Sequence, residues 1–207
     1  MLNLIKKAKT RDELIALLRY ARPLSWYVPG RTIHVHDKMQ KNYSYTLTER
    51  PGKNLKFKPE LSPARMLKLG VFEGKYLNDC IMEFPREWYV NAKISPGHPD
   101  INCNAFKIKS RLSLATWRKN NWIPAAPGDR DIRGWFQWYC RYWLGRRQPE
   151  VDAVQISRWK SFVRHRGQIL ASYKKMHKIP RTISEKKKHR PRQRQALLQW
   201  AYNSVKL

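Results

Sequence analysis

The sequence predicts an α+β protein that is mainly α-helical, with a small N-terminal β-hairpin region, a Trp-rich helical core and a basic C-terminal arm. Three observations support this fold class. Apolar residues recur at helical spacing in several segments, two short segments near the start alternate like strands, and one run is dense in aromatic residues. We expect three regions: residues 1–56 with the first helix and the hairpin, residues 57–177 with the helical core, and residues 178–207 with the arm and a last helix.

The first region opens with an amphipathic helix. Thr10 and Glu13 have the spacing of a capping box, in which each side chain bonds the backbone amide of the other residue. The apolar stripe that follows comprises Leu14, Leu17, Leu18 and Ala21. Because the residue before a proline disfavours the helical conformation, this helix should stop at Arg22, before Pro23.

Two alternating segments, 32–36 and 43–48, predict a β-hairpin. His34 and His36 would share one face of its first strand. Two histidines so placed can bind a metal ion, but the sequence shows no third ligand, and a solvated strand face is the simpler interpretation. We therefore expect neither a metal nor a cofactor.

Short helices are expected in the core region. Ser62 can cap a helix that runs through Leu69, with Pro63 in its first turn and Gly70 just past its end. A second short helix should span residues 114–120.

The aromatic run WFQWYCRYWLGRR predicts a longer helix between Asp131, a suitable N-cap, and Gly145, a C-terminal glycine. Its many rings cannot all point inward from one helix, so most should pack in the core and one or two should stay outside. By helical angle, Trp138 is the ring expected outside, toward the same side as Arg141. There it would stack on bases or insert between them.

The last third of the chain is predicted to be helical and then very basic. Pro149 should begin a long helix that runs to about Lys175. Residues 178–194 then carry many cations against one acid, Glu185, and we expect a mobile arm that becomes ordered on a polyanion. A last helix should cover about 191–202.

Charge is the strongest functional signal in this chain. Lys and Arg total 43 against 15 Asp and Glu, a formal net charge of +28. With 42% hydrophobic and 12% aromatic residues the chain can form a core, which excludes a disordered basic tail. No apolar run reaches the about 18 residues of a transmembrane helix. Three cysteines cannot form a fully paired disulfide framework. None of them lies in a CxxC pair, which excludes a zinc ribbon or finger.

We therefore predict a nucleic-acid-binding protein, with DNA favoured over RNA and no membrane partner. Lys and Arg would neutralise phosphates, while rings and Arg planes would stack on bases. The start of the chain lacks the pattern of a secretory signal, which favours an intracellular location, in cytoplasm or nucleoid, with an organelle left open. The expected contact residues are Trp138, Arg141, Arg146, Arg147, Arg158, Arg164, Arg166, Lys186, Lys187, Lys188, Arg190, Arg192 and Arg194.

Two other functions stay open: an enzyme acting on DNA, such as a base-excision glycosylase or a nuclease, and a structural protein of an RNA particle such as the ribosome. The sequence has no Walker loop and no GxGxxG, GxSxG or HExxH motif. Because acids are scarce, the candidate catalytic residues are Asp79, Asp129 and Asp131, which could orient a water, bind Mg²⁺ or stabilise a sugar cation. The alternative is structural: Asp131 would cap a helix, and Asp79 and Asp129 would pair with arginines.

Four segments are similar to a known group of proteins: LSPARMLKLGVFEGKYLNDC, EFPREWY, DIRGWFQWYCRYWLGRR and RPRQRQALLQWAY. Over about residues 57–202 the chain resembles a family of small, basic, Trp-rich, uncharacterised proteins of microbes and large viruses. That family has no established activity, so the resemblance implies no catalytic residue.

Overall fold

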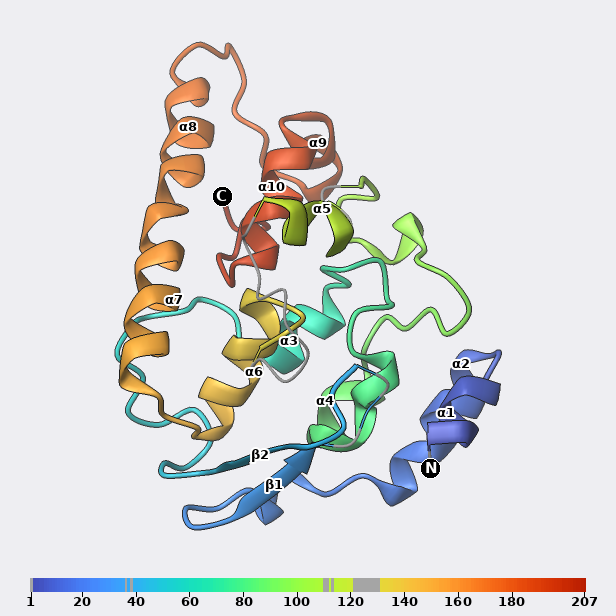
Figure 1. The fold of residues 1–207 in the computed structure, drawn as a ribbon. Helices are drawn as coiled ribbons and strands as arrows, with labels where there is room; N and C mark the ends of the chain where they lie inside the picture. The colour runs from blue at the N-terminus through green and yellow to red at the C-terminus, as the bar shows by residue number, and fades with distance from the viewer. Residues whose placement is uncertain (1, 36, 38, 110–111, 113, 121–130) are drawn as a thin grey trace.

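The computed structural model describes residues 2–35, 37, 39–109, 112, 114–120 and 131–207. Within these residues one two-stranded antiparallel sheet accompanies a set of α-helices and short 3₁₀ helices (Figure 1). The expected fold class, α+β and mainly helical, is confirmed. Of the helices described, none has the length and apolar character needed to cross a lipid bilayer.

The N-terminal segment forms several short helical elements instead of one longer helix. They are α1 (Leu2–Lys7), α2 (Arg11–Ala16), η1 (Leu17–Tyr20) and η2 (Leu24–Trp26), where η denotes a 3₁₀ helix. The capping box is confirmed: the Glu13 amide donates to Thr10 Oγ1 over 3.2 Å, and the Thr10 amide donates to Glu13 Oε2 over 3.1 Å. The predicted apolar stripe continues into η1, where Leu17 and Leu18 are buried.

The hairpin forms as predicted. Its strands are β1 (Thr32–Val35) and β2 (Tyr43–Thr46). They pair antiparallel with Ile33 opposite Tyr45, and both of these side chains are buried. On the exposed face, His34 Nδ1 lies 2.9 Å from Ser44 Oγ. His36, the other histidine considered as a metal ligand, lies outside the described residues.

Short helices surround the core region. They are α3 (Pro63–Lys68), η3 (Asn78–Glu83), α4 (Glu87–Val90), η4 (Ile101–Cys103) and α5 (Leu114–Lys119). The predicted cap of α3 is confirmed, since Ser62 Oγ accepts from the Arg65 amide over 3.3 Å. Gly70 has a left-handed φ of +61°, and a Cβ there would lie 1.8 Å from the Cys103 carbonyl oxygen, so this turn requires glycine.

Helix α6 (Trp135–Leu144) lies in the middle of the molecule (Figure 1). It ends as predicted at Gly145, which has a left-handed φ of +117°. It begins after Gly134 and not at the predicted cap Asp131. The main hydrophobic cluster includes α6 and draws buried residues from Ile5 to Ala201, so it joins both ends of the chain.

The predicted long helix from Pro149 is two helices. They are α7 (Pro149–Ser161) and α8 (Val163–Tyr173). They meet at Phe162, whose ring stacks on Trp200 with 4.7 Å between centroids. A tertiary contact therefore coincides with the break, which the sequence pattern of the segment itself does not reveal.

The last helix forms as predicted, as α10 (Pro191–Gln199). The segment before it, expected to be a mobile arm, is instead folded and contains α9 (Ile183–Lys188). A second capping box, between Thr182 and Glu185, begins α9. Lys186 Nζ donates to the Val205 carbonyl over 2.9 Å, and Arg194 Nη1 donates to the Ser204 carbonyl over 2.9 Å. The prediction was wrong because two of the arm's cations bond backbone carbonyls of the chain's last residues and fix the segment in place.

Candidate functional site

Trp138, the ring expected at the surface, is fully buried. Its indole Nε1 donates to Asp152 Oδ1 over 2.8 Å, and its ring stacks on Tyr142 with 5.0 Å between centroids. Phe57, from a distant segment, covers it as well. The expectation of exposure was wrong because α6 is covered around its circumference, so helical angle alone does not identify an outer face. Trp138 is a core residue and cannot stack on a base.

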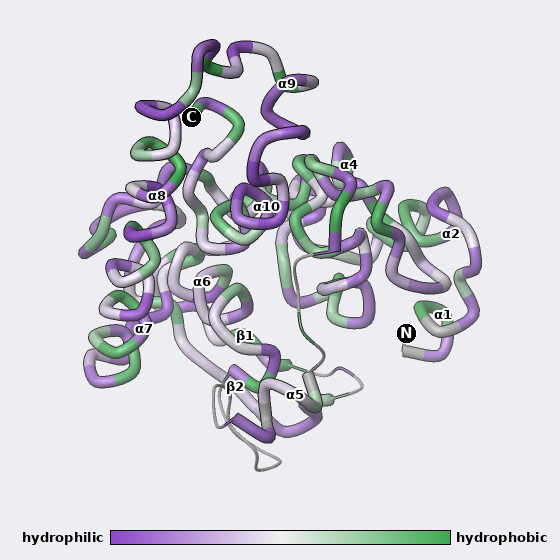
Figure 2. Tube along the Cα trace, turned by 90° about the horizontal axis from the view of Figure 1, so that it is seen from above, coloured by the Kyte–Doolittle hydropathy of each residue, from purple (hydrophilic) through white to green (hydrophobic). Residues whose placement is uncertain are grey.

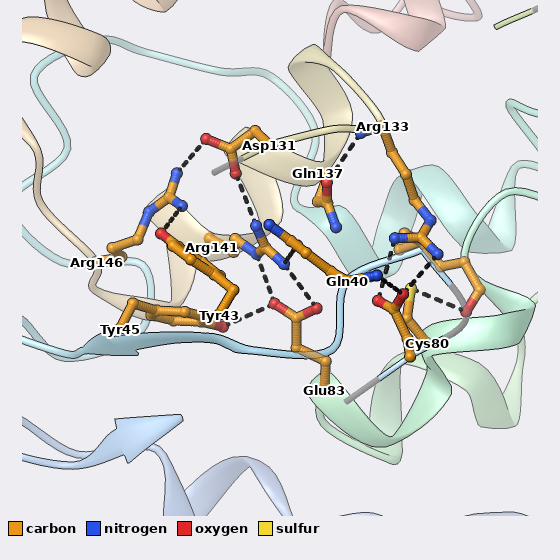
Figure 3. Close-up of polar contacts among 12 residues, drawn as sticks. Gln40, Tyr43, Tyr45, Cys80, Glu83, Asp131, Arg133, Gln137, Arg141 and Arg146 are labelled. Carbon is orange, nitrogen blue, oxygen red and sulfur yellow. Dashed lines mark hydrogen bonds and ion pairs between the residues drawn. The ribbon is translucent and has the colours of Figure 1, made fainter. Parts of the chain in front are cut away.

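Arg141 and Arg146, two of the expected phosphate contacts, are also buried. Figure 3 shows the polar contacts of both guanidiniums. Arg141 Nε lies 2.6 Å from Glu83 Oε1, and its Nη1 lies 3.2 Å from Asp131 Oδ1. Arg146 Nη2 lies 2.6 Å from Asp131 Oδ2. Both arginines therefore pair with carboxylates inside the protein, and the prediction that they contact phosphates is corrected. Since Asp131 joins the two guanidiniums, it does not cap α6.

The hairpin covers this ion-pair network (Figure 3). Tyr45 Oη donates to Glu83 Oε1 over 3.1 Å, and Arg146 Nη1 donates to Tyr43 Oη over 2.9 Å. The Arg141 guanidinium carbon lies 4.9 Å from the centre of the Tyr43 ring, which adds a cation–π contact. Charged groups are buried at low cost only when they are paired and hydrogen-bonded. Both arginines are paired with carboxylates, but the buried Nε of Arg146 has no hydrogen-bond partner among the described residues.

A third buried arginine, Arg133, extends the network toward the surface. Arg133 Nη1 and Nη2 each lie 3.1 Å from a carboxylate oxygen of Asp37, and Nη2 lies 2.7 Å from Asp79 Oδ2. The Asp37 side chain is 2% exposed, whereas that of Asp79 is 35% exposed. Sequence reasoning missed Arg133 and Asp37. The available signal was the scarcity of acids, because a lone acid within an apolar segment such as Glu83 requires a buried partner.

The network keeps its guanidiniums charged. Burial alone would lower the pKa of Arg141, but the charges of Glu83 and Asp131 raise that pKa well above its ordinary value. For Arg146, burial likewise lowers the pKa and the charge of Asp131 raises it. The net effect is again a raised pKa. The cluster is therefore a fixed set of ion pairs rather than a proton-transfer site.

Asp37, Cys80 and Glu83 are the one group among the described residues whose donor atoms approach closely enough to suggest a metal site, within 4.8 Å of one another. Burial raises the pKa of the Cys80 thiol well above its ordinary value, which opposes the thiolate that metals bind. Guanidiniums of Arg133 and Arg141 already hold the two carboxylates. We assign this group to the ion-pair network and not to a metal.

The three candidate catalytic acids differ in their surroundings and in whether the structure describes them. Asp131 is 5% exposed and held by two arginines, so it cannot reach a substrate. Asp129 lies outside the described residues. Asp79 pairs with Arg133, as the structural alternative expected, and it also lines a cavity. Of the described candidate acids, Asp79 alone lines a cavity that a ligand could enter.

That cavity has a volume of about 630 Å³, within the range of small-molecule sites. It lies between the N-terminal helices, the segment before η3, the start of α6 and the end of α10. Lys9, Lys75, Asn78, Asp79 and Arg133 supply charged and polar groups to its lining. The remaining lining is mainly apolar, with several aromatic rings.

Other expected contact residues do lie at the surface. Arg158, Arg164, Lys188, Arg190 and Arg192 are exposed. Arg147, Arg166 and Lys187 are half-buried; Arg147 Nη2 donates to the Lys53 carbonyl over 2.9 Å, and Arg166 pairs with Glu60. Lys186 and Arg194, by contrast, are buried and bond backbone carbonyls, so their prediction as phosphate contacts is corrected.

The exposed cations of residues 158–192 belong to one packed unit, which we call the C-terminal cationic surface. Gln193 Nε2 lies 3.1 Å from His165 Nδ1, and Ser172 Oγ lies 2.8 Å from His189 Nε2, so the segment before α10 is fixed against α8. Figure 2 shows this part of the chain, around α9 and the start of α10, as largely hydrophilic. The surface also includes exposed cations that were not among the expected contacts: Lys160, Lys174, Lys175, Lys178 and Arg181.

Within the described part of the chain, then, two features could bind a ligand: the C-terminal cationic surface and the aromatic cavity beside Asp79. Comparison with protein-family models, with curated proteins and with solved structures finds no match to this chain. Evidence for function therefore comes from the chemistry of these two features.

Proposed function

We propose that this protein binds nucleic acid by holding its phosphates on the C-terminal cationic surface. One observation carries the proposal: between residues 158 and 192 exposed Lys and Arg side chains accumulate against a single acid, Glu185. Glu185 Oε2 accepts from the amides of Arg181 and Thr182 over 2.8 and 3.0 Å, and Glu185 Oε1 lies 3.5 Å from Lys178 Nζ, so this acid pairs with one of the surface's cations. The surface therefore keeps an almost unopposed positive charge, which needs a polyanion nearby.

The surface is already ordered, which favours tight binding. Helix α9 begins at a capping box and packs against α10, and α10 packs against α8, so a ligand does not have to order them. Each phosphate that Lys or Arg neutralises releases a condensed counterion, which supplies sequence-independent affinity. Duplex DNA carries about one charge per 1.7 Å of axis, a density that suits a surface with many cations. We therefore favour duplex DNA as the partner.

Helix α6 does not stack on bases in this mechanism, because Trp138 and Arg141 are buried. Phosphate contacts position a protein on nucleic acid but carry no direct sequence information. We therefore propose binding with little sequence preference at this surface.

The test is a pair of triple variants with the same charge change. The first, Arg164→Gln with Lys188→Gln and Arg192→Gln, removes three exposed cations of the surface. The second, Lys7→Gln with Arg11→Gln and Arg19→Gln, removes three exposed cations from the N-terminal helices, which lie on the opposite side of the molecule from α8 (Figures 1 and 2). The affinity of each protein for a short fluorescent DNA duplex is measured by anisotropy at low salt.

The first triple variant should lose on the order of tenfold in affinity, and the second should stay close to the wild type. Duplex RNA and single-stranded RNA are measured in parallel. If the protein binds RNA but not duplex DNA, the result would favour the other function, a structural protein of an RNA particle. The proposal is wrong if the wild type binds no nucleic acid, or if both triple variants lose affinity equally.

A further inference from the structure

We infer that the cavity beside Asp79 receives one unpaired nucleobase of the nucleic acid, an inference that rests on the proposed function. It assigns a base-reading site in addition to the phosphate-binding surface. The size, the ring lining, the polar groups and the position of the cavity each point to this occupant.

The lining suits a flat aromatic ligand. Six rings contribute to it, from Phe72, Tyr76, Trp117, Trp135, Phe136 and Trp200. Phe72 stacks on Tyr76 with 4.5 Å between centroids, and Trp135 lies 4.9 Å from Trp200, so rings from distant segments pack as pairs. Phe72, Tyr76 and Trp200 are only partly buried, which leaves ring surface toward the cavity. Bases stack on such rings whatever their sequence.

The polar groups suit the N–H edge of a base. Asp79 Oδ2 is held at 2.7 Å by Arg133 Nη2, which fixes the carboxylate at the cavity wall. An ionised carboxylate has about four acceptor sites, so the pair with Arg133 leaves further capacity. All four bases carry an N–H donor on the edge that a duplex uses for pairing. An unpaired base presents that donor, whereas a paired base does not.

Cations at the cavity suit the phosphates beside such a base. Lys9 is exposed and Lys75 is half-buried, and both line the cavity. Lys75 Nζ donates to the carbonyl of Pro96, which is another lining residue. An apolar ligand without charge would gain nothing from these ammonium groups, whereas a nucleotide gains from both the rings and the cations.

Helix α10 connects the cavity to the C-terminal cationic surface. Arg190 and Arg192 lie at its beginning, whereas Gln199 and Trp200, at its end, line the cavity. Nine residues at about 1.5 Å per residue span about 13 Å, which is the rise of about four nucleotides in a duplex. A strand held by its phosphates at the start of α10 therefore reaches the cavity within a few nucleotides.

The experiment compares two DNA duplexes that are identical except for one unpaired nucleotide in a single-base bulge. The wild type should bind the bulged duplex about tenfold more tightly than the fully paired one. Asp79→Asn should abolish most of that preference, measured as the ratio of the variant's affinities for the bulged and the paired duplex. Asp12→Asn, which alters a carboxylate that is 95% exposed on α2, is the matched control and should keep the preference.

Two further measurements keep the test decisive. Phe72→Leu removes a ring from the wall without touching Asp79, and it should also reduce the preference; melting curves confirm that each variant is folded. A bulge carrying 5-iodouracil, irradiated in the complex, should crosslink to peptides containing residues 72–76, 135–136 or 200.

Absence of a bulge preference in the wild type would overturn the inference. A preference retained in both Asp79→Asn and Phe72→Leu, or crosslinks that fall only outside the cavity, would overturn it as well. If the paired duplex still binds in these cases, the cationic surface stands and the cavity assignment alone fails. If neither duplex binds, the proposed function fails with it.

Discussion

Arg141 holds Glu83 in a two-point ion pair, with Nε 2.6 Å from Oε1 and Nη2 3.0 Å from Oε2. Both side chains are almost fully buried, at 0% and 3% exposure. The pair joins the centre of α6 to the end of η3, and Tyr45 of the hairpin bonds the same carboxylate. The hairpin, η3 and α6 therefore meet at charges that cannot be separated without cost.

Glu83→Gln should destabilise the protein strongly. The amide keeps the size of the side chain but removes the charge that faces the buried Arg141, and breaking a buried pair in this way costs about 3–5 kcal/mol. The free energy of unfolding in urea measures the effect. Glu150→Gln, at an exposed position of α7, should change it by less than about 0.5 kcal/mol. Equal effects of the two substitutions would contradict a structural role for the pair.

Two glycine-to-alanine substitutions should change the stability of the folded protein in opposite directions. At Gly145, φ is +117° and an added Cβ would lie 2.0 Å from the Glu49 carbonyl oxygen, so Gly145→Ala should cost about 2–4 kcal/mol. At Gly167, inside α8, nothing lies within 4 Å of an added Cβ, so Gly167→Ala should gain about 0.5–1 kcal/mol. Thermal unfolding of both variants checks the prediction, and a tolerated Gly145→Ala would refute the close approach of Gly145 to Glu49.

Helix α9 should lose its N-terminal cap in acid. Bonds from the Thr182 and Arg181 amides lower the pKa of Glu185 from 4.5 to about 2. A carboxyl group whose pKa is depressed by folding stabilises the folded state above its unfolded pKa, and this contribution disappears as the pH falls from about 4.5 to about 2. Backbone chemical shifts of α9, followed by NMR over that interval, should titrate in the wild type. In Glu185→Gln they should not, and equal titration of both proteins would contradict the assignment.

The sequence predicted elements whose signals are local. The capping box at Thr10 and Glu13, the Ser62 cap of α3, the hairpin and the end of α6 at Gly145 all depend on residues a few positions apart. Such short-range patterns specify backbone hydrogen bonds directly.

The sequence did not predict which cations are buried. Arg141 and Arg194 look like solvent-facing residues because their partners, Glu83 and the carbonyl of Ser204, come from other segments of the fold. A helical wheel locates an outer face only when one side of the helix meets solvent, and α6 has no such side. The site residues near Asp79 were missed for the same reason, since the cavity combines segments from both ends of the chain.

The salt dependence of duplex DNA binding tests the central claim most directly. On a plot of log affinity against log salt concentration, each phosphate contact contributes a slope of about −0.9. The wild type should show a steep slope, and the variant without Arg164, Lys188 and Arg192 should have a slope less steep by about 2.7, while the variant without Lys7, Arg11 and Arg19 keeps the wild-type slope. A flat wild-type response, or slopes that fall equally in the two variants, would contradict phosphate binding by the C-terminal cationic surface.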